Sequence, residues 1–256
     1  MISVSNLSKT YKDTTVLAIE SLELKSGEII GLVGNNGAGK TTFFSLLLDL
    51  IKPTTGYIEN TGVRVDQSED WKQSTAAFID DTFLIGYLTP EEYFSFIAGL
   101  RNVAKGDLDL FLERFKTFFN DEVLEQKKYI RDFSKGNQKK VGIAAAFIGA
   151  PQLVILDEPF ANLDPRAQMQ LQRLLRELNT ELGCSVFVSS HDLLHVSELC
   201  QRILILNKGT LVKDARREEI SLEGLRAFFA EEIAEPQDEA LAIQDESAPK
   251  TDSENW

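Results

Sequence analysis

The sequence is poor in cysteine and shows no pattern of metal-binding cysteines. Cys184 and Cys200 are the 2 cysteines among 256 residues, and a single pair cannot build a disulfide framework. Nothing around either of them has the spacing of a metal site. We therefore expect both to be small, buried hydrophobic residues in a protein of a reducing compartment.

Long apolar runs are also missing. The longest, such as residues 141–150, fall far short of the roughly 20 residues that a helix needs to span a bilayer. The N-terminus reads Met-Ile-Ser-Val-Ser-Asn and has no basic region before an apolar one, so the sequence predicts no signal peptide. Any role at a membrane is expected to come through a partner.

An excess of basic residues is absent as well. The chain has 27 basic and 40 acidic residues, a net charge of −13. Residues 229–256 contain nine of the acidic residues and one lysine, a net charge of −8, which leaves −5 for residues 1–228. The mildly acidic main part argues against a broad nucleic-acid surface, so we expect no nucleic-acid partner. The acidic tail contains Pro236 and Pro249 and is expected to be disordered.

Residues 34–42 carry the strongest functional signal in the sequence. They match the pattern G-x-x-x-x-G-K-[ST] and lie between the apolar runs 29–33 and 43–48, which is the strand, loop and helix setting that this motif requires. The glycines allow backbone N–H groups to turn toward a phosphate, and the start of a helix adds positive partial charge. The predicted nucleotide-binding residues of this P-loop are Gly34, Asn35, Asn36, Gly37, Ala38, Gly39, Lys40, Thr41 and Thr42.

Two side chains of this loop have separate expected roles. Lys40 would reach the β- and γ-phosphates of a nucleotide, and the Thr41 hydroxyl would be a ligand to Mg²⁺. The alternative is a glycine-rich turn that binds no ligand. The agreement of the motif with its setting favours the phosphate-binding interpretation.

Periodicity and turn signals predict an α/β fold. Residues 1–27 alternate polar and apolar side chains, which predicts antiparallel strands, and residues 204–212 read as a hairpin. The apolar runs 153–156 and 184–190 are typical of buried parallel strands. Helices are expected to begin at Thr89-Pro90, near Ser134 and at residues 162–165.

The helix-rich stretch that begins at Thr89 contains many phenylalanines. Phe111, Phe115 and Phe118 recur at helical spacing, which favours a helical core over a partner-binding face. Ser134 is placed to cap the following helix, and a cap alone would account for it.

Charged side chains follow two of the predicted buried strands. Asp157 and Glu158 come directly after the run 153–156, and His191 follows the run 184–190. The carboxyl ends of parallel strands are where ligands bind in open α/β sheets. With a P-loop nearby, Asp157 would hold Mg²⁺, Glu158 would accept a proton from an attacking water, and His191 would contact the γ-phosphate. The alternatives are a solvated strand end for the carboxylates and a structural role for the histidine.

From about residue 1 to residue 225 the chain resembles the ATP-binding subunit of ABC transporters, with five motifs in the family's order. Tyr11 matches the family's aromatic residue that stacks on adenine, although by itself it reads as a loop or strand-edge aromatic. The remaining motifs beside the P-loop are the signature sequence at residues 134–138, the Walker B motif at 156–159, the D-loop at 162–164 and the switch histidine at His191.

The resemblance implies an architecture and a working unit. The domain would cover residues 1–228, with a P-loop NTPase (RecA-like) α/β core, an antiparallel β portion and a helical subdomain at about residues 88–150. Two subunits, most simply a homodimer, would pair head to tail around two Mg-ATP. Ser134 and Gly136 of one subunit would then complete the nucleotide site of the other.

Three positions depart from the family's pattern. Asp80 stands where a glutamine usually contacts Mg²⁺, and a carboxylate is a possible but shorter and charged metal ligand. In the signature, Lys135 and Asn137 replace glycine and glutamine, whereas Ser134 and Gly136 remain. Ala161 stands where the D-loop often has serine. We expect ATP hydrolysis to persist, at a low rate.

The sequence therefore predicts an ATPase subunit that drives a separate transmembrane permease. It would lie in the cytoplasm, held at the inner face of the cell membrane by the permease. The lysine-containing signature resembles subunits that serve exporter-type (ABC-2-like) permeases. The alternatives are a non-transport ABC protein and a regulatory ABC module with low hydrolysis. The chain lacks the second ATPase unit and the long coiled coils of known non-transport types.

Overall fold

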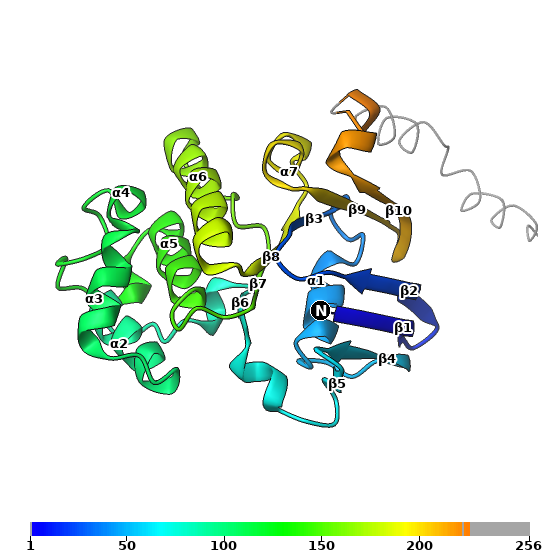
Figure 1. Ribbon diagram of the computed structural model, residues 1–256, viewed down its shortest axis with the longest axis horizontal. Coiled ribbons are helices and arrows are strands. Elements are labelled where there is room, and N and C mark those ends of the chain that lie inside the picture. The colour runs from blue at the N-terminus through cyan, green and yellow to red at the C-terminus, as the bar shows by residue number, and fades with distance from the viewer. Residues whose placement is uncertain (1, 222, 226–256) are drawn as a thin grey trace, which may run out of the picture.

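The computed structural model describes residues 2–221 and 223–225 and contains one large mixed sheet flanked by helices (Figure 1). Hydrogen bonds order its strands as β5-β4-β1-β2-β10-β9-β3-β8-β7-β6. The tail 229–256 lies outside the described residues. The strands are β1 (Ile2–Tyr11), β2 (Thr14–Leu24), β3 (Ile29–Val33), β4 (Thr55–Asn60), β5 (Val63–Arg64), β6 (Thr75–Phe78), β7 (Leu153–Leu156), β8 (Ser185–Ser190), β9 (Arg202–Asn207) and β10 (Thr210–Arg216).

The central strands are parallel, as their apolar runs predict. β3 pairs with β8 and β9, and β7 pairs with β6 and β8. The register aligns Val33 with Ser190 and Phe78 with Leu156. Because these strands end level with one another, the residues that follow them meet at one edge of the sheet.

The antiparallel portion is confirmed at both predicted places. β1 pairs with β2 and with β4, and β9 and β10 form the expected hairpin. At its turn Lys208 has φ 43° and Gly209 has φ 82°. Two consecutive positive φ angles are what a tight two-residue hairpin turn requires.

Most of the helices gather at one end of the molecule, beyond β6 and β7, whereas α1 lies against the sheet (Figure 1). A ten-stranded sheet and this helical part together form the predicted α/β architecture. The helices are α1 (Lys40–Leu47), α2 (Pro90–Leu100), α3 (Lys105–Glu113), α4 (Lys116–Phe119), α5 (Lys135–Ala146), α6 (Pro165–Leu182) and α7 (Leu193–Leu199), with 3₁₀ turns at Asp70–Gln73, Asp81–Phe83, Ile130–Asp132 and Arg217–Glu219.

The predicted helix starts are present with their caps. Thr89 forms a full capping box with Glu92, and Pro90 takes the first helical position. The Ser134 side chain accepts a hydrogen bond from the backbone N–H of Asn137 at the start of α5. Asp164 caps α6 in the same way. The sequence signals therefore place three helix starts correctly.

The phenylalanine-rich stretch forms a helical core, as expected. Phe115 lies between α3 and α4, and both Phe115 and Phe118 are buried. Phe111 is partly buried and packs against this core, with its ring centroid 5.1 Å from that of Phe115. The prediction of core rather than partner face is thus confirmed for these three residues.

Each face of the sheet carries its own hydrophobic core. Ile29 and Val33 of β3 pack into the core shared with the helical part, whereas Ile30 and Leu32 pack into the core under α1. This division follows from the two-residue period of a strand. The central strands are therefore buried on both sides.

The two cysteines are buried and free, as predicted. Burial disfavours the thiolate, and it raises the pKa of Cys184 to about 11 and also raises that of Cys200. Burial of both thiols therefore disfavours the reactive thiolate form. The reducing compartment remains a prediction.

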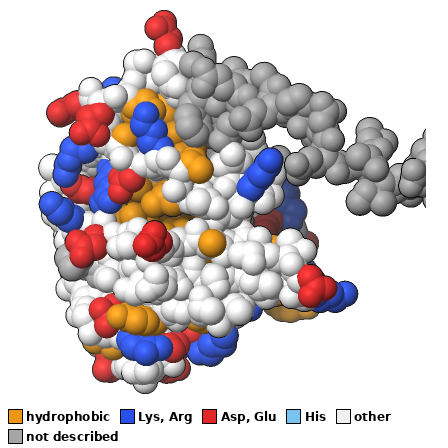
Figure 2. All heavy atoms as spheres, turned by 90° about the vertical axis from the view of Figure 1, so that its right-hand side faces the viewer, with side chains coloured by type: hydrophobic (Ala, Val, Ile, Leu, Met, Phe, Trp, Pro, Cys, Tyr) orange, Lys and Arg blue, Asp and Glu red, His pale blue; other side chains and the backbone are white. Residues whose placement is uncertain are grey.

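The surface of the β portion mixes charges of both signs. Figure 2 shows acidic and basic side chains intermingled over this face, around a group of hydrophobic side chains. In the part of the chain that the structure describes, none of the helices has the length and apolar character of a membrane span.

Candidate functional site

The P-loop connects β3 to α1 at the carboxyl edge of the sheet. Gly39, with φ 103°, is the N-cap of α1, a conformation that glycine adopts without strain. A Cβ atom at Gly34 would lie 2.4 Å from the carbonyl oxygen of Leu206, so a larger residue does not fit there. The loop therefore has the glycine-dependent geometry that its motif predicts, and its contact with a nucleotide remains a prediction.

The Lys40 side chain folds back over the loop. It is 7% exposed, and its Nζ donates hydrogen bonds to the carbonyl oxygens of Gly34, at 2.7 Å, and Asn35, at 3.3 Å. The ammonium group is thus held where the loop closes, at the start of α1.

Asp157 joins the end of β7 to the P-loop. Its Oδ2 accepts a hydrogen bond from the Thr41 hydroxyl at 2.6 Å, and its Oδ1 accepts one from the Ser189 hydroxyl. Asp157 is 6% exposed. The structure therefore brings together the two oxygen-bearing side chains that the sequence predicts as Mg²⁺ ligands.

The chemistry of this pair fits Mg²⁺, which prefers a few carboxylate or hydroxyl oxygens together with phosphate and water. Among residues 2–221 and 223–225, no three His, Cys, Asp or Glu side chains form a group that could hold a metal ion. An ion bound by Thr41 and Asp157 would therefore need phosphate oxygens of the nucleotide as further ligands.

Glu158 stands between two cationic or polar partners. Its Oε1 lies 3.4 Å from Lys40 Nζ, and its Oε2 lies 2.8 Å from His191 Nδ1. The residue has φ 46°, a left-handed conformation that is unusual without glycine and clusters at functional sites. The predicted base, the P-loop lysine and the strand-end histidine thus form one contact chain.

Two residues that hold Glu158 in this conformation have no motif in the sequence. Ser189 Oγ accepts a hydrogen bond from the Glu158 N–H at 2.8 Å, and Lys139 Nζ donates to the Glu158 carbonyl at 2.7 Å. Ser189 is fully buried, and desolvation lowers the pKa of Lys139. The position of Ser189, two residues before His191, is a weak signal for it. Lys139 comes from α5, and only the tertiary structure reveals its role.

Asp80 lies at the same edge of the sheet but not in this cluster. It follows β6, and its carboxylate accepts a hydrogen bond from the Thr82 N–H at 2.8 Å. Hydrogen bonding by the Thr82 side chain, and then by the Thr82 backbone, lowers the pKa of Asp80. Within the described residues it forms no hydrogen bond with Thr41 or Asp157. Its predicted contact with Mg²⁺ therefore remains a prediction.

Three predicted site residues, Tyr11, Ser134 and Gly136, lie outside the contact chain of Lys40, Glu158 and His191. Tyr11 ends β1 and is 50% exposed, with Lys9 Nζ 4.8 Å from its ring centroid. At Gly136, a Cβ atom would lie 2.8 Å from the Asn162 carbonyl oxygen, so the start of α5 packs on the loop before α6. Within the described residues, Ser134 and Gly136 form no hydrogen bond with the P-loop of their own chain.

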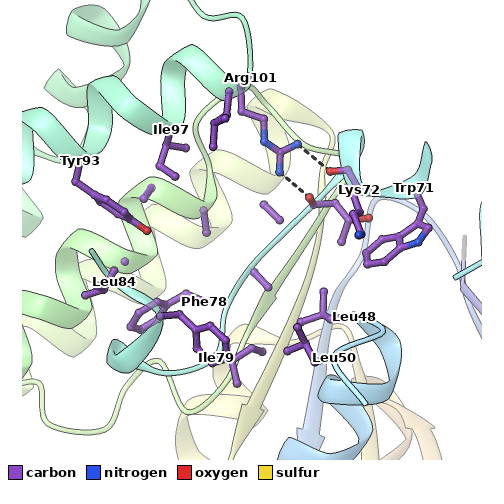
Figure 3. A pocket seen from close by; sticks show the side chains of 18 residues that line it. Leu48, Leu50, Trp71, Lys72, Phe78, Ile79, Leu84, Tyr93, Ile97 and Arg101 are labelled. Carbon is purple, nitrogen blue, oxygen red and sulfur yellow. Dashed lines mark hydrogen bonds between the residues drawn. The ribbon is translucent and has the colours of Figure 1, made fainter. Parts of the chain in front are cut away.

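A second feature is an apolar groove of about 390 Å³ between the helical part and the sheet. Figure 3 shows Tyr93 and Ile97 of α2 on one side and Leu48 and Leu50, after α1, on the other. The Arg101 guanidinium spans the upper end, where it donates hydrogen bonds to backbone carbonyls that include that of Gln73, at 2.6 Å. The aromatic lining residues are Trp71, Phe78, Phe83 and Tyr93.

Comparison with known proteins gives consistent matches along the chain. Residues 17–161 match a family described as ABC transporter. The bacitracin transport ATP-binding protein BcrA of Enterococcus faecalis is 33% identical over 222 residues, which cover 86% of this chain and 70% of that protein. An uncharacterized ABC transporter ATP-binding protein of Methanocaldococcus jannaschii is 36% identical over 223 residues, 86% of this chain and 79% of that protein.

Solved structures share the fold as well. The chain is similar to an ATP-binding subunit of an ABC transporter, with a TM-score of 0.77 and 29% identity over 90% of this chain and 98% of that one. It is also similar to an ATP-binding cassette in a dimeric, post-hydrolysis state bound to ADP and phosphate. That match has a TM-score of 0.74 and 25% identity, and it covers 85% of this chain and 99% of that one.

Proposed function

The chain belongs to the ABC transporter family and is an ATP-binding ATPase, and we propose that two copies of it close head to tail around two Mg-ATP. The contact chain from Lys40 through Glu158 to His191 supports ATP hydrolysis in this proposal. In it Glu158 is the base, Lys40 is the cation of the P-loop, and His191 senses the phosphate.

In the proposed reaction, a water attacks the γ-phosphorus of ATP and the bond to the bridging oxygen breaks. Glu158 orients this water and accepts its proton, because its carboxylate is held at the carboxyl edge beside Lys40. Lys40 binds the β- and γ-phosphates, and His191 contacts the γ-phosphate. Thr41 and Asp157 would hold Mg²⁺, which would supply positive charge to neutralise the charge that develops on the phosphates. Tyr11 stacks on the adenine ring.

The position of the signature residues supports the proposed pairing of two copies. Ser134 caps α5 and Gly136 lies in its first turn, and the start of a helix suits a phosphate. Within the described residues, neither forms a hydrogen bond with the P-loop of its own chain. In a head-to-tail dimer they would face the nucleotide on the second copy. The similarity to a dimeric cassette with bound ADP and phosphate supports this arrangement.

We further propose that the groove between the helical part and the sheet receives a cytoplasmic helix of a separate permease. Its lining is mostly apolar and includes exposed side chains such as Leu50, Phe83 and Leu100. An amphipathic helix that lays its apolar face into such a groove is a recurring mode of recognition. This contact would hold the chain at the inner face of the membrane, and the lysine-containing signature favours an exporter-type permease.

The proposal is tested with Glu158→Gln, which retains the shape of the side chain and removes the base. With ATP and Mg²⁺ this variant is expected to form a stable dimer with about twice the mass of the 28.7 kDa chain, measured by sedimentation. Adding Lys40→Ala to it should keep the chain monomeric. A Glu158→Gln chain that stays monomeric at saturating ATP would refute the two-copy model.

A further inference from the structure

One position at which this chain departs from the family's pattern, Lys135, contacts the residue next to another, Asp80. Lys135 is the first residue of α5, directly after the cap Ser134, and its Nζ forms an ion pair with Asp81. Asp81 neighbours Asp80, the residue that stands at the family's glutamine position. The unusual lysine of the signature thus has its partner in the unusual acidic loop that follows β6.

The two side chains of this ion pair differ in how exposed they are and how freely they can move. The Asp81 side chain is 21% exposed and begins the 3₁₀ turn that Asp80 caps, whereas the Lys135 side chain is 69% exposed. A long exposed side chain loses entropy when it is held in one ion pair, so such pairs exchange partners readily. Lys135 can therefore leave Asp81 by side-chain rotation alone, with no change in the fold.

A lysine at the first position of a helix is an unusual choice. Its charge has the same sign as the positive end of the helix dipole, and the first turn of α5 contains no acidic residue. Among the described ion pairs, Asp81 supplies the carboxylate next to Lys135. The start of α5 therefore concentrates positive charge, and this charge is balanced from another segment rather than from within the helix.

These observations, together with the two-copy model on which the inference rests, give Lys135 a role. We propose that Lys135 leaves Asp81 and binds the γ-phosphate of the ATP held by the second copy when the dimer closes. Asp81 competes with the phosphate for the same ammonium group. While the ion pair persists, it ties the helical part to the loop after β6, and ATP entry releases that tie.

The test uses the Glu158→Gln chain, in which hydrolysis does not consume ATP, and measures the ATP concentration that gives half-maximal dimer by sedimentation. Lys135→Gly, which restores the family's residue, should raise this concentration about tenfold, because one charge-assisted contact is lost. Lys135→Arg should need about the same ATP concentration as the parent for half-maximal dimer. Lys105→Gly is the matched control, because Lys105 is likewise the first residue of an exposed helix start, and it should have no effect.

Competition by Asp81 is tested in the same assay. Asp81→Asn should lower the half-maximal ATP concentration about threefold, because Lys135 no longer has to leave a carboxylate. In the Lys135→Gly background, Asp81→Asn should have no effect. An effect of Asp81→Asn that persists without Lys135 would overturn the competition. Thermal unfolding shows whether each variant is folded.

The outcomes separate this inference from the two-copy model. If the parent Glu158→Gln chain does not dimerise with ATP, the two-copy model fails. If the parent dimerises and Lys135→Gly does so at the same ATP concentration, only the role of Lys135 fails.

Discussion

At the residue scale, Ser189 connects the two carboxylate residues of the site. Its hydroxyl donates to Asp157 Oδ1 and accepts from the Glu158 N–H. Ser190 is equally buried, but its hydroxyl contacts Asp192 instead. Substitutions at the two serines therefore distinguish two effects. Both remove a buried hydroxyl, but only the one at Ser189 removes a contact with the site.

We predict that Ser189→Ala lowers both the free energy of unfolding and the rate of ATP hydrolysis. Leaving the part-buried Glu158 N–H without its acceptor should cost about 1–3 kcal/mol. Ser190→Ala should cost a similar amount of stability and leave kcat close to that of the parent. Chemical denaturation and steady-state kinetics measure the two effects, and equal losses of kcat in both variants would contradict the role of Ser189.

Lys139 gives a second prediction at this scale. Lys139→Met retains most of the side-chain volume and removes the hydrogen bond to the Glu158 carbonyl. It should lower kcat about tenfold with little change in KM, because only the base is displaced. The control is Lys140→Met, since Lys140 pairs with Glu122 at 3.0 Å and not with the site. A kcat that falls equally in both variants would show that the lysines act only on stability.

The sequence predicts those site residues whose motif belongs to a strand end or to a glycine-rich loop. Lys40, Thr41, Asp157, Glu158 and His191 each follow a strand or a glycine-rich loop, and parallel strands bring their ends together. Lys139 could not be predicted, and Ser189 had only the weak signal of its position before His191, because a lysine within a helix and a serine within a strand are compatible with many surroundings.

At the element scale, α5 packs very closely on the end of β6. A Cβ atom at Gly142 would lie 2.1 Å from a ring carbon of Phe78. At Gly99, in α2, nothing lies within 4 Å of the corresponding point. One helical glycine is therefore required by packing, and the other is not.

Gly142→Ala is predicted to destabilise the chain by about 1–3 kcal/mol or more, because the Phe78 ring must move. The same change at Gly99 should stabilise it by roughly 0.5–1 kcal/mol, since alanine is the better helix former. Denaturant titration of both variants measures the difference. If both variants are more stable than the parent, α5 does not pack as closely on the end of β6 as described.

The end of a helix is harder to predict from the sequence than its start. Thr89, Ser134 and Asp164 carry capping signals with a local physical cause. No proline or glycine marks the break between α3 and α4. There Phe115, the N-cap of α4, is buried in the core, so tertiary packing decides where α3 ends.

At the scale of the whole molecule, the groove lies where distant segments meet. Its lining comes from five segments of the chain, within residues 48–50, 71–79, 83–84, 93–101 and 142–146. No local pattern in the sequence predicts such a surface. The phenylalanines at 111, 115 and 118, by contrast, lie in the core and not in the groove.

We predict that Leu100→Asp weakens attachment of the chain to membranes of its own host. Leu100 lines the groove and is 65% exposed, so a carboxylate there opposes an apolar helix without disturbing the core. Leu110, in α3, is 72% exposed and does not line the groove, so Leu110→Asp is the control. The membrane-bound fraction measures the effect, and an equal fraction for both variants would contradict a permease site in this groove.

The most direct test of the two-copy ATPase is the rate of Mg²⁺-dependent ATP hydrolysis per chain, measured over a range of protein concentrations. The proposed dimer predicts that the rate per chain rises with protein concentration and falls about 10²- to 10⁴-fold in Glu158→Gln. A constant rate per chain, down to concentrations at which sedimentation shows only monomer, would contradict it.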